Sequence, residues 1–186
     1  MQNGNQIDWP DGETYQHPAF VEVAWLGWFE SYANADSLPY IEAYGIPEVR
    51  SIYRGTLRYP GWCDMVTQMQ KLNLFDETPR DFSGHTYASL MRELTASTDR
   101  NRPVEEGVAA FLKLPPYALT IRKLAWLGLF EEKKVSPESG SLRDVISEIY
   151  ADKLVFAPGE SDLVAMQHQF DVIYPADGQR KRFVST

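Results

Sequence analysis

The sequence has almost no cysteine, since Cys63 is the single one among 186 residues. One thiol cannot form an intrachain disulfide or a thiolate metal site, so we expect a reducing compartment, the cytoplasm. No apolar run approaches the roughly 20 residues that cross a bilayer. The first residues also lack the basic start and apolar middle of a signal peptide. We therefore expect no membrane partner.

Positive charge is also scarce. Lysine and arginine number 18 against 26 aspartate and glutamate residues, which gives a formal net charge of −8. A chain with this balance and no long basic run matches nucleic acid poorly, because binding to phosphates needs a basic surface. The basic cluster at residues 180–182 is too short to change this expectation.

Motifs for catalysis and for cofactors are missing. His17, His85 and His168 are scattered, and no nucleophile pairs with them by spacing, so we expect His168 to be a packed or hydrogen-bonded residue at the core edge. Cys63 lies early in a predicted helix and is expected to be a half-buried structural thiol. Neither G-x-G-x-x-G nor G-x-x-x-x-G-K-[ST] occurs, and the acidic pairs lack metal-ligand spacing. We therefore assign no catalytic, cofactor-binding or metal-ligating residue.

What the sequence does contain is apolar and aromatic: 44% of its residues are hydrophobic and 13% are aromatic, which indicates a globular chain. Residues 19–32 favour a strand covered on both faces and bent near Gly27, with a helix as the alternative. Residues 38–44 predict a short helix with Asp36 or Ser37 as its N-cap. Further strands are predicted over 52–59, 163–174 and 182–185, the last two as a hairpin. Amphipathic spacing predicts helices over residues 62–72, 87–94, 105–114, 117–127 and 139–154.

This order, with strands at both ends and helices between, predicts an α+β fold. We expect a mixed β-sheet domain of residues 1–59 and 155–186 that carries an all-helical insertion over residues 60–154. Two predicted helix ends share one capping signal, with Asn73 and Gly128 placed where a left-handed residue ends a helix. No nucleotide-binding domain of the Rossmann type is expected in these residues.

The most informative stretch follows the first polar loop. In a strand over 52–59, alternation places Arg54, Thr56 and Arg58 on one face, with Tyr53 and Leu57 on the other. Guanidinium groups keep their charge and offer paired donors that match carboxylates and phosphates. The stretch therefore indicates an anion site, although arginine and threonine are also common on solvated strand faces.

Several motifs together resemble a known family. Asn34-Ala-Asp-Ser37 and Tyr44-Gly-Ile46 precede Arg54-Gly-Thr-Leu-Arg-Tyr59, and Trp126-Leu-Gly-Leu-Phe130 and Asp162-Leu-Val with Gln167-His168 and Phe170 follow. In this order, from about residue 19 to the C-terminus, the chain resembles the substrate domain of glutamate-forming saccharopine dehydrogenases. The resemblance is weakest across residues 76–120.

The resemblance implies an oxidoreductase of lysine metabolism. Members of the family join glutamate and α-aminoadipate semialdehyde as an imine, which they reduce with NADP(H) to saccharopine. Their chains combine an N-terminal Rossmann-type domain, a substrate-binding α/β domain and a helical domain inserted into it, and they are commonly homodimers. The present chain resembles the last two parts. The resemblance therefore implies an amino-acid substrate, a missing nucleotide domain as partner, no NADP(H) bound by this chain and no activity without that domain.

The substrate contacts that the resemblance implies lie on the central strand and on the motif before it: Thr56, Leu57, Arg58, Arg54, Asn34 and Ser37. Leu57 would contribute through its backbone. The family motif Asn-Arg-Asp-Ser carries a second arginine for the substrate, and this sequence has Ala35 at that position. Without a replacement, losing one guanidinium should weaken binding by roughly 1.5–3 kcal/mol.

Two alternatives stay open. Arg54 or Arg50 could compensate for Ala35, or the substrate could be another amine–aldehyde conjugate, such as a carboxylated polyamine. A different class of function is a non-enzymatic interaction or dimerisation module that associates through the aromatic-rich residues 20–32.

Overall fold

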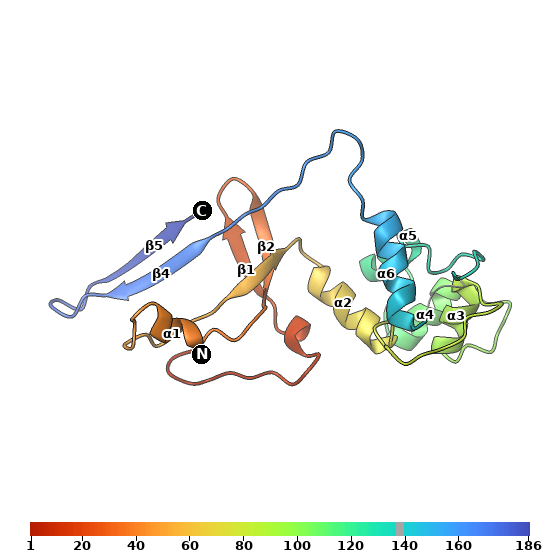
Figure 1. The fold of residues 1–186 in the computed structure, drawn as a ribbon, viewed down its shortest axis with the longest axis horizontal. Helices are drawn as coiled ribbons and strands as arrows, with labels where there is room; N and C mark the ends of the chain where they lie inside the picture. Colours follow the sequence, from red (N-terminus) through yellow and green to blue (C-terminus); the bar gives the residue numbers. More distant parts are fainter. Residues whose placement is uncertain (137–139) are drawn as a thin grey trace. The chain divides into compact units, whose positions relative to one another are not determined.

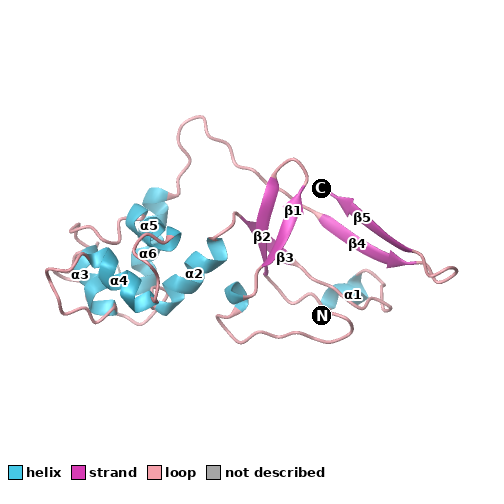
Figure 2. Cartoon of the chain, turned by 180° about the vertical axis from the view of Figure 1, so that it is seen from behind, coloured by secondary structure: helices cyan, strands magenta, loops and turns pink. Residues whose placement is uncertain are grey.

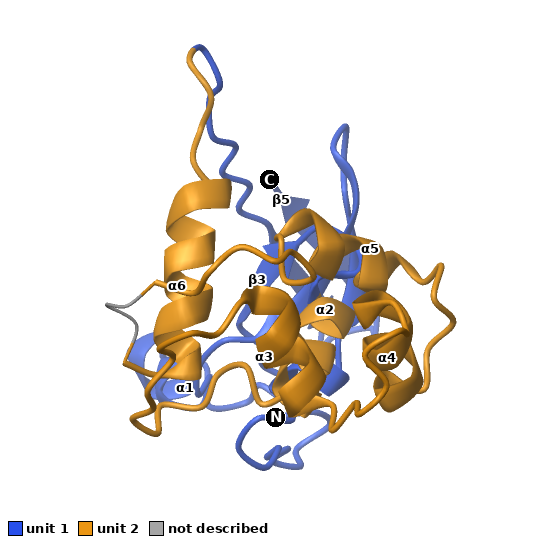
Figure 3. Ribbon diagram, turned by 90° about the vertical axis from the view of Figure 1, so that its right-hand side faces the viewer, with its two compact units in different colours: residues 1–62, 159–186 blue, residues 63–158 orange. Residues whose placement is uncertain are grey.

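The computed structural model describes residues 1–136 and 140–186. The chain combines helices with small sheets (Figures 1 and 2), which confirms the α+β class. It divides into two compact units (Figure 3). Unit 1 comprises Met1–Trp62 and Gly159–Thr186, and unit 2 comprises Cys63–Pro158. No helix in the described ranges has both the length and the apolar character needed to span a bilayer.

Unit 1 contains a three-stranded antiparallel sheet in the order β1-β2-β3. These strands are β1 (Ala19–Val23), β2 (Gly27–Ala33) and β3 (Gly55–Arg58). A second sheet is the antiparallel hairpin of β4 (His168–Ile173) and β5 (Arg180–Ser185). The predicted C-terminal hairpin is confirmed, although its first strand is shorter than predicted and its second begins two residues earlier. Instead of the expected mixed sheet there are two sheets in which every strand pair is antiparallel.

The prediction of one covered strand over residues 19–32 is wrong, because a turn divides it into β1 and β2. The Leu26 N–H donates to the Val23 carbonyl at 3.0 Å, and Trp25 and Gly27 have φ of +70° and +96°. Neither face is fully covered, since Trp25 and Trp28 are exposed. The turn was missed because its residues, Gly27 apart, are apolar or aromatic rather than the usual polar turn formers.

The short helix of unit 1, α1 (Pro39–Ala43), forms within the predicted range, but its predicted cap is wrong. Leu38 occupies the N-cap position, and no side chain caps the helix. Asp36 instead accepts a hydrogen bond from the Leu38 N–H at 2.9 Å. The Ser37 hydroxyl accepts one from the Arg54 N–H at 3.0 Å. The tertiary contact with Arg54 therefore takes the oxygen that a local cap would have used.

Helices form over all five predicted segments. They are α2 (Trp62–Lys71), α3 (Tyr87–Leu94), α4 (Val104–Leu112), α5 (Leu119–Trp126) and α6 (Leu142–Lys153). The predicted start of the last, Ser139, lies outside the described residues. The described helix begins after Ser141, whose hydroxyl accepts a hydrogen bond from the Asp144 N–H at 3.2 Å. Both predicted helix ends are confirmed, since Asn73 and Gly128 have φ of +58° and +85°.

The principal hydrophobic core lies within unit 2. It is built from the apolar stripes of the helices and from the residues that follow their ends, such as Met69, Leu72, Leu90, Leu124 and Ile149. Cys63 is buried rather than half-buried as expected, since only 1% of it is exposed on the face of α2 that packs inward. Unit 2 therefore has the packed interior of an independent domain.

Unit 1 has little interior of its own. Among its described residues, Val23 and Phe29 are the buried apolar side chains. Many large apolar side chains of the sheet and of the hairpin are exposed, including Phe20, Trp25, Trp28, Phe170 and Phe183. Unit 1 therefore exposes an unusual amount of apolar side-chain surface.

Candidate functional site

The predicted site residues that lie together are found where β2 and β3 diverge. The register pairs Tyr32 with Thr56 across the two antiparallel strands, so the residue after β2, Asn34, lies beside the start of β3. The Asn34 side-chain amide donates to the Thr56 hydroxyl at 2.8 Å. The backbone is also tied, since the Asn34 N–H donates to the Arg54 carbonyl at 3.4 Å. The two motifs that the sequence singled out therefore form one hydrogen-bonded group.

Arg54 is held from two sides. Its backbone N–H donates to the Ser37 hydroxyl at 3.0 Å, and its Nη1 donates to the Tyr40 hydroxyl at 2.8 Å. The guanidinium carbon also lies 5.4 Å from the centre of the Tyr40 ring, within cation–π range. Among the described residues Tyr40 is the hydrogen-bond partner of this guanidinium, which leaves further N–H donors for an anion. Sequence reasoning missed Tyr40, because nothing local pairs it with Arg54.

Gly55 sets the geometry between Arg54 and Thr56. A Cβ at this position would lie 2.4 Å from Tyr53 Oη and 2.7 Å from the backbone oxygen of Tyr32. The Tyr53 and Ser31 hydroxyls occupy this space and lie 2.9 Å apart, within hydrogen-bond distance. The absence of a side chain at Gly55 lets Tyr53 lie across the strand there. The glycine is therefore a structural requirement of the site.

Arg58 lies at the other end of β3. It is exposed, its guanidinium carbon lies 5.3 Å from the centre of the Trp62 ring, and its Nη1 donates to the Leu57 carbonyl at 3.1 Å. Strand alternation puts Thr56 and Arg58 on one face. In the described residues no hydrogen bond or ring contact joins Arg58 to the Arg54 group. The predicted residues therefore form two groups along β3, one around Arg54 and Thr56 and one at Leu57 and Arg58.

Glu30 fixes the junction between β3 and α2. It pairs with Arg58 in the strand register and is only 6% exposed. Its Oε1 accepts a hydrogen bond from the Gly61 N–H at 2.7 Å, one residue before α2 begins. A carboxylate is favourable here, because the first N–H groups of a helix carry partial positive charge. This contact stabilises the turn that follows Arg58.

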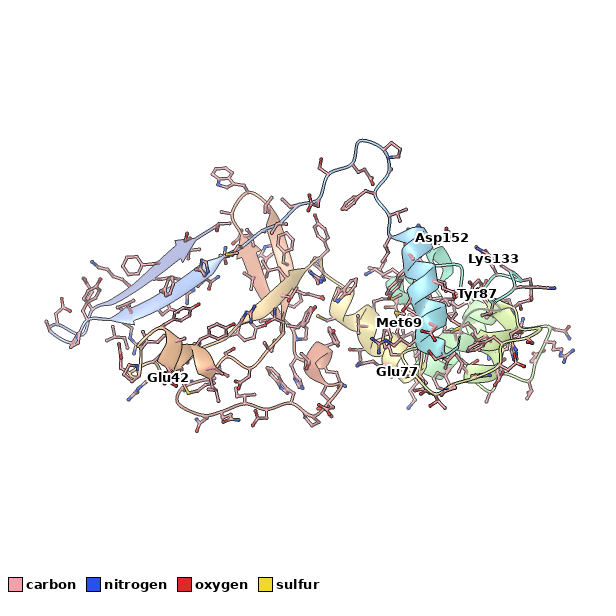
Figure 4. The ribbon with its side chains drawn as sticks, viewed as in Figure 1. Glu42, Met69, Glu77, Tyr87, Lys133 and Asp152 are labelled. Atoms are coloured by element: carbon pink, nitrogen blue, oxygen red, sulfur yellow. The ribbon has the colours of Figure 1, made fainter. Side chains whose placement is uncertain are left out.

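The remaining predicted positions are peripheral to these contacts. Ala35 is exposed in the loop between β2 and α1. Arg50 is exposed as well, and its backbone carbonyl accepts a hydrogen bond from the Gly4 N–H at 2.7 Å. A hollow of about 520 Å³ lies beside α1 and is lined by Asp36 and Glu42 among mainly apolar residues. Glu42 is labelled in Figure 4. The two carboxylates disfavour an anion, so the hollow is not part of the arginine site.

Each of the three histidines has its own set of neighbours. His17 stacks on Trp9 with ring centres 5.2 Å apart, and the His85 Nε2 lies 3.2 Å from Glu93 Oε2. His168 is exposed on β4 and stacks on Phe170, so the expectation that it is packed at a core edge is wrong. The reason is that the hairpin has no layer of unit 1 covering its strands. Among the described residues no group of acidic, histidine or cysteine side chains could hold a metal ion.

Comparison with known proteins gives a consistent set of similarities. A family model described as the saccharopine dehydrogenase C-terminal domain matches residues 1–186. The mitochondrial alpha-aminoadipic semialdehyde synthase of Bos taurus is 34% identical over 152 residues, which cover 79% of this chain and 16% of that protein. The NADP(+), L-glutamate-forming saccharopine dehydrogenase of Pyricularia oryzae is 30% identical over 164 residues, which cover 85% of this chain and 36% of that protein. The chain thus spans well under half the length of both relatives.

A solved structure supports the same fold. Apo, histidine-tagged saccharopine dehydrogenase (L-Glu forming) from Saccharomyces cerevisiae has a TM-score of 0.83 and 21% identity. The match covers 98% of this chain and 42% of that chain. At this identity the likeness concerns the fold, and it includes both units of the present chain.

Proposed function

The chain belongs to the saccharopine dehydrogenase C-terminal domain family, and from this we propose that it is the substrate-binding part of a glutamate-forming saccharopine dehydrogenase. The reaction joins glutamate and α-aminoadipate semialdehyde as an imine. Hydride from NADP(H) and a proton then convert this imine into the secondary amine of saccharopine. The observation that carries the proposal is the family match over residues 1–186. In this assignment unit 1 binds substrate and unit 2 is the helical insertion.

We assign recognition of the substrate carboxylates to β3 and to the loop before α1. Arg58 offers an exposed guanidinium at the end of β3, and Thr56 offers a hydroxyl on the same face. Arg54 adds a second guanidinium, which Tyr40 and Ser37 hold in place. β3 lies at one edge of the sheet, so alternate backbone groups of this strand face away from β2. At this edge the Leu57 backbone would hydrogen bond to the substrate. Charge-assisted contacts of this kind are the strongest that a carboxylate can make.

The nicotinamide cofactor, in this proposal, is bound by another domain of the full protein. The residues present here do not fit a dinucleotide phosphate. The junction from β3 to α2 has a single glycine, Gly61, and the Glu30 carboxylate already accepts a hydrogen bond from its N–H. A phosphate at this helix start would meet that carboxylate instead of open N–H donors. We therefore expect no turnover from residues 1–186 alone, and we assign no catalytic residue.

Unit 1 would associate with that nucleotide domain and with a second copy of the chain. The supporting observation is its exposed apolar surface, in which Phe20, Trp25 and Trp28 of the β1–β2 hairpin take part. This surface is also the feature that favours the alternative of a non-enzymatic interaction module.

We place the protein in the cytoplasm, where a reduced thiol such as that of the lone Cys63 is the normal state.

Calorimetric titration of the chain with saccharopine tests the site. Replacement of Arg58 by alanine should weaken binding about 10- to 100-fold, which is the effect of losing one charge-assisted contact of roughly 1.5–3 kcal/mol. Arg54→Ala should act in the same direction. Arg122→Ala, an exposed arginine on α5 of unit 2, is the matched control and should bind as the wild type does. Equal affinities of the wild type and Arg58→Ala would contradict the assignment.

The alternative substrate class is favoured by a single position, Ala35. If saccharopine is the substrate, Ala35→Arg should strengthen its binding, because the side chain restores the guanidinium that the family motif carries at this position. If the substrate is a carboxylated polyamine, the wild type should prefer that ligand and Ala35→Arg should shift the preference toward saccharopine. Titrating both ligands into both proteins distinguishes these substrates.

Steady-state NADPH oxidation by the full-length protein and by residues 1–186 tests where the cofactor binds.

A further inference from the structure

A second cavity lies within unit 2, between α6 and the loop that follows α5. Its volume is about 340 Å³, and its lining includes Tyr87, Lys133 and Asp152, which are labelled in Figure 4. The inner part is apolar, since Leu127 and Ile149 are buried there. A volume of this size suits a small organic molecule rather than an ion alone.

The walls of this cavity are fixed by backbone hydrogen bonds. The Tyr87 N–H donates to the Lys133 carbonyl at 3.0 Å, and the Ala88 N–H donates to the Glu131 carbonyl at 2.9 Å. These N–H groups belong to the first turn of α3, where helices have no internal partners for them. The loop thus satisfies the helix start, and the helix start in turn holds the loop. The cavity is therefore preformed, which lowers the entropic cost of binding a ligand.

The side chain of Tyr87 offers its hydroxyl to the cavity. It is more than nine-tenths buried, with 8% exposed, and it lines the cavity. Within the described ranges no residue hydrogen bonds to its hydroxyl, which keeps some accessible surface and is therefore open to a ligand in the cavity. Burial, with a further contribution from the Glu148, Asp152 and Glu131 carboxylates, raises the pKa of Tyr87. The phenol therefore stays protonated at neutral pH and can both donate and accept a hydrogen bond.

Charges of both signs line the cavity. The acids are Glu131, Glu148 and Asp152, and the bases are Lys133, Lys134 and Lys153. The three acids all lie near enough to the phenol to disfavour its ionisation. The region around the Tyr87 hydroxyl is therefore negative, and an ammonium group there would find a hydrogen-bond acceptor and two or three carboxylates. The lysines supply positive charge for a carboxylate elsewhere on the same ligand.

We propose that this cavity binds a small amino acid. Its ammonium group lies against the Tyr87 hydroxyl and the carboxylates of Glu148 and Asp152, and its carboxylate reaches Lys133 and Lys134. The balanced charge of the lining favours a zwitterion over a dianion or a dication of the same length. Because the ligand contacts both α6 and the loop after α5, binding stabilises unit 2 by mass action. This cavity shares no residue with the proposed substrate site on β3. Failure of one proposal can therefore be distinguished from failure of the other.

Titration of the full chain with three probes of similar length tests the proposal. They are 5-aminopentanoate, which is zwitterionic, pentane-1,5-diamine, which is a dication, and glutarate, which is a dianion. The readout is the methyl NMR signals of Leu127 and Ile149, which line the cavity. We expect saturable shifts of both signals with 5-aminopentanoate, weaker binding of the diamine and no binding of glutarate. Absence of saturable shifts with 5-aminopentanoate up to about 20 mM, a weak-binding limit of roughly −2.3 kcal/mol, overturns the proposal.

Two variants and a control assign the contacts. Tyr87→Phe keeps the ring and removes a hydroxyl without a partner, so it should fold normally and bind the zwitterion about 3- to 10-fold more weakly. Asp152→Asn should weaken binding by a similar factor. Glu105→Gln removes an exposed carboxylate on α4, outside the cavity, and should change nothing. Unchanged affinity in both Tyr87→Phe and Asp152→Asn overturns the proposal, and glutarate binding as tight as that of 5-aminopentanoate overturns the placement of the ammonium group.

Discussion

Replacement of Gly55 by alanine should open the sheet at the proposed substrate site. The added Cβ would lie 2.4 Å from Tyr53 Oη, 2.6 Å from Ser31 Oγ and 2.7 Å from the Tyr32 carbonyl oxygen. Atoms do not approach a methyl carbon this closely, so each of the three must move. Gly55 does not have a positive φ, and the backbone itself tolerates alanine. The whole penalty is therefore steric.

The size of the effect follows from what each neighbour can do. Tyr53 and Ser31 can rotate away, but they then lose their mutual hydrogen bond, worth about 0.5–1.5 kcal/mol. The Tyr32 carbonyl belongs to β2 and cannot move without disturbing the pairing with β3, and overpacking of this kind costs about 1–3 kcal/mol. Reduced freedom of the unfolded chain offsets about 0.4–1 kcal/mol. At the middle of each range, these terms leave a net loss of local stability of about 2 kcal/mol.

Native-state amide hydrogen exchange measures this loss separately in the two units. Protection of β2 and β3 should fall about 10- to 100-fold in Gly55→Ala, while protection of α3 stays unchanged. Binding at Arg54 and Thr56, which flank the glycine, should weaken with it. Gly107→Ala is the control: its Cβ would meet Ser97 Oγ at 3.3 Å, and a helical alanine is favoured by roughly 0.8–1 kcal/mol over glycine. Wild-type protection of β2 and β3 in Gly55→Ala would refute this reasoning.

Three further predictions concern other parts of the chain. Met69→Ala should lower the free energy of unfolding of unit 2 by about 2–5 kcal/mol in urea, because Met69 is 0% exposed, and a loss below about 1 kcal/mol would contradict its place in the core. Thr86→Ala removes the N-cap of α3 and its exchange of hydrogen bonds with Ser89, so thermal unfolding should show a loss of about 1 kcal/mol, and an unchanged midpoint would count against the cap. The hydrogen bond from Arg182 lowers the pKa of Asp171 below its ordinary value of 3.8. This contact therefore stabilises the hairpin above that value and is lost as the pH falls through the lowered pKa, and carboxyl NMR should show Arg182→Ala moving the titration back up.

The helices could be predicted from the sequence because their signals are local. A helix can be located from apolar residues at helical intervals and from a residue near its end that favours the left-handed conformation. Asn73 and Gly128 are such residues. The turn at Trp25 could not be predicted. Its φ is positive, which is rare for an aromatic residue, so nothing in the sequence marks this position as a turn. The same limit applies to the hairpin strands, whose alternation around Phe170 is typical of a half-buried sheet although both faces are exposed.

The candidate site was predicted in part. Alternation within β3 correctly places Thr56 and Arg58 on one face, since this depends on the strand alone. The contacts of Arg54 with Tyr40 and of Asn34 with Thr56 depend on the path of the loop and on the register of β2 against β3. No periodicity encodes these distances. Which of these residues bind substrate stays a prediction for the titrations described above.

The interruption of unit 1 by unit 2 has a consequence for synthesis on the ribosome. The segment Gly159–Thr186 is made only after the whole of Cys63–Pro158, so the helical core can collapse while the final hairpin does not yet exist. During that interval unit 1 is incomplete and its apolar side chains, such as Phe20 and Trp28, are exposed, which is the state in which nascent chains most readily aggregate. The rate at which translation passes the α6 codons should therefore set how long the newborn sheet depends on chaperones.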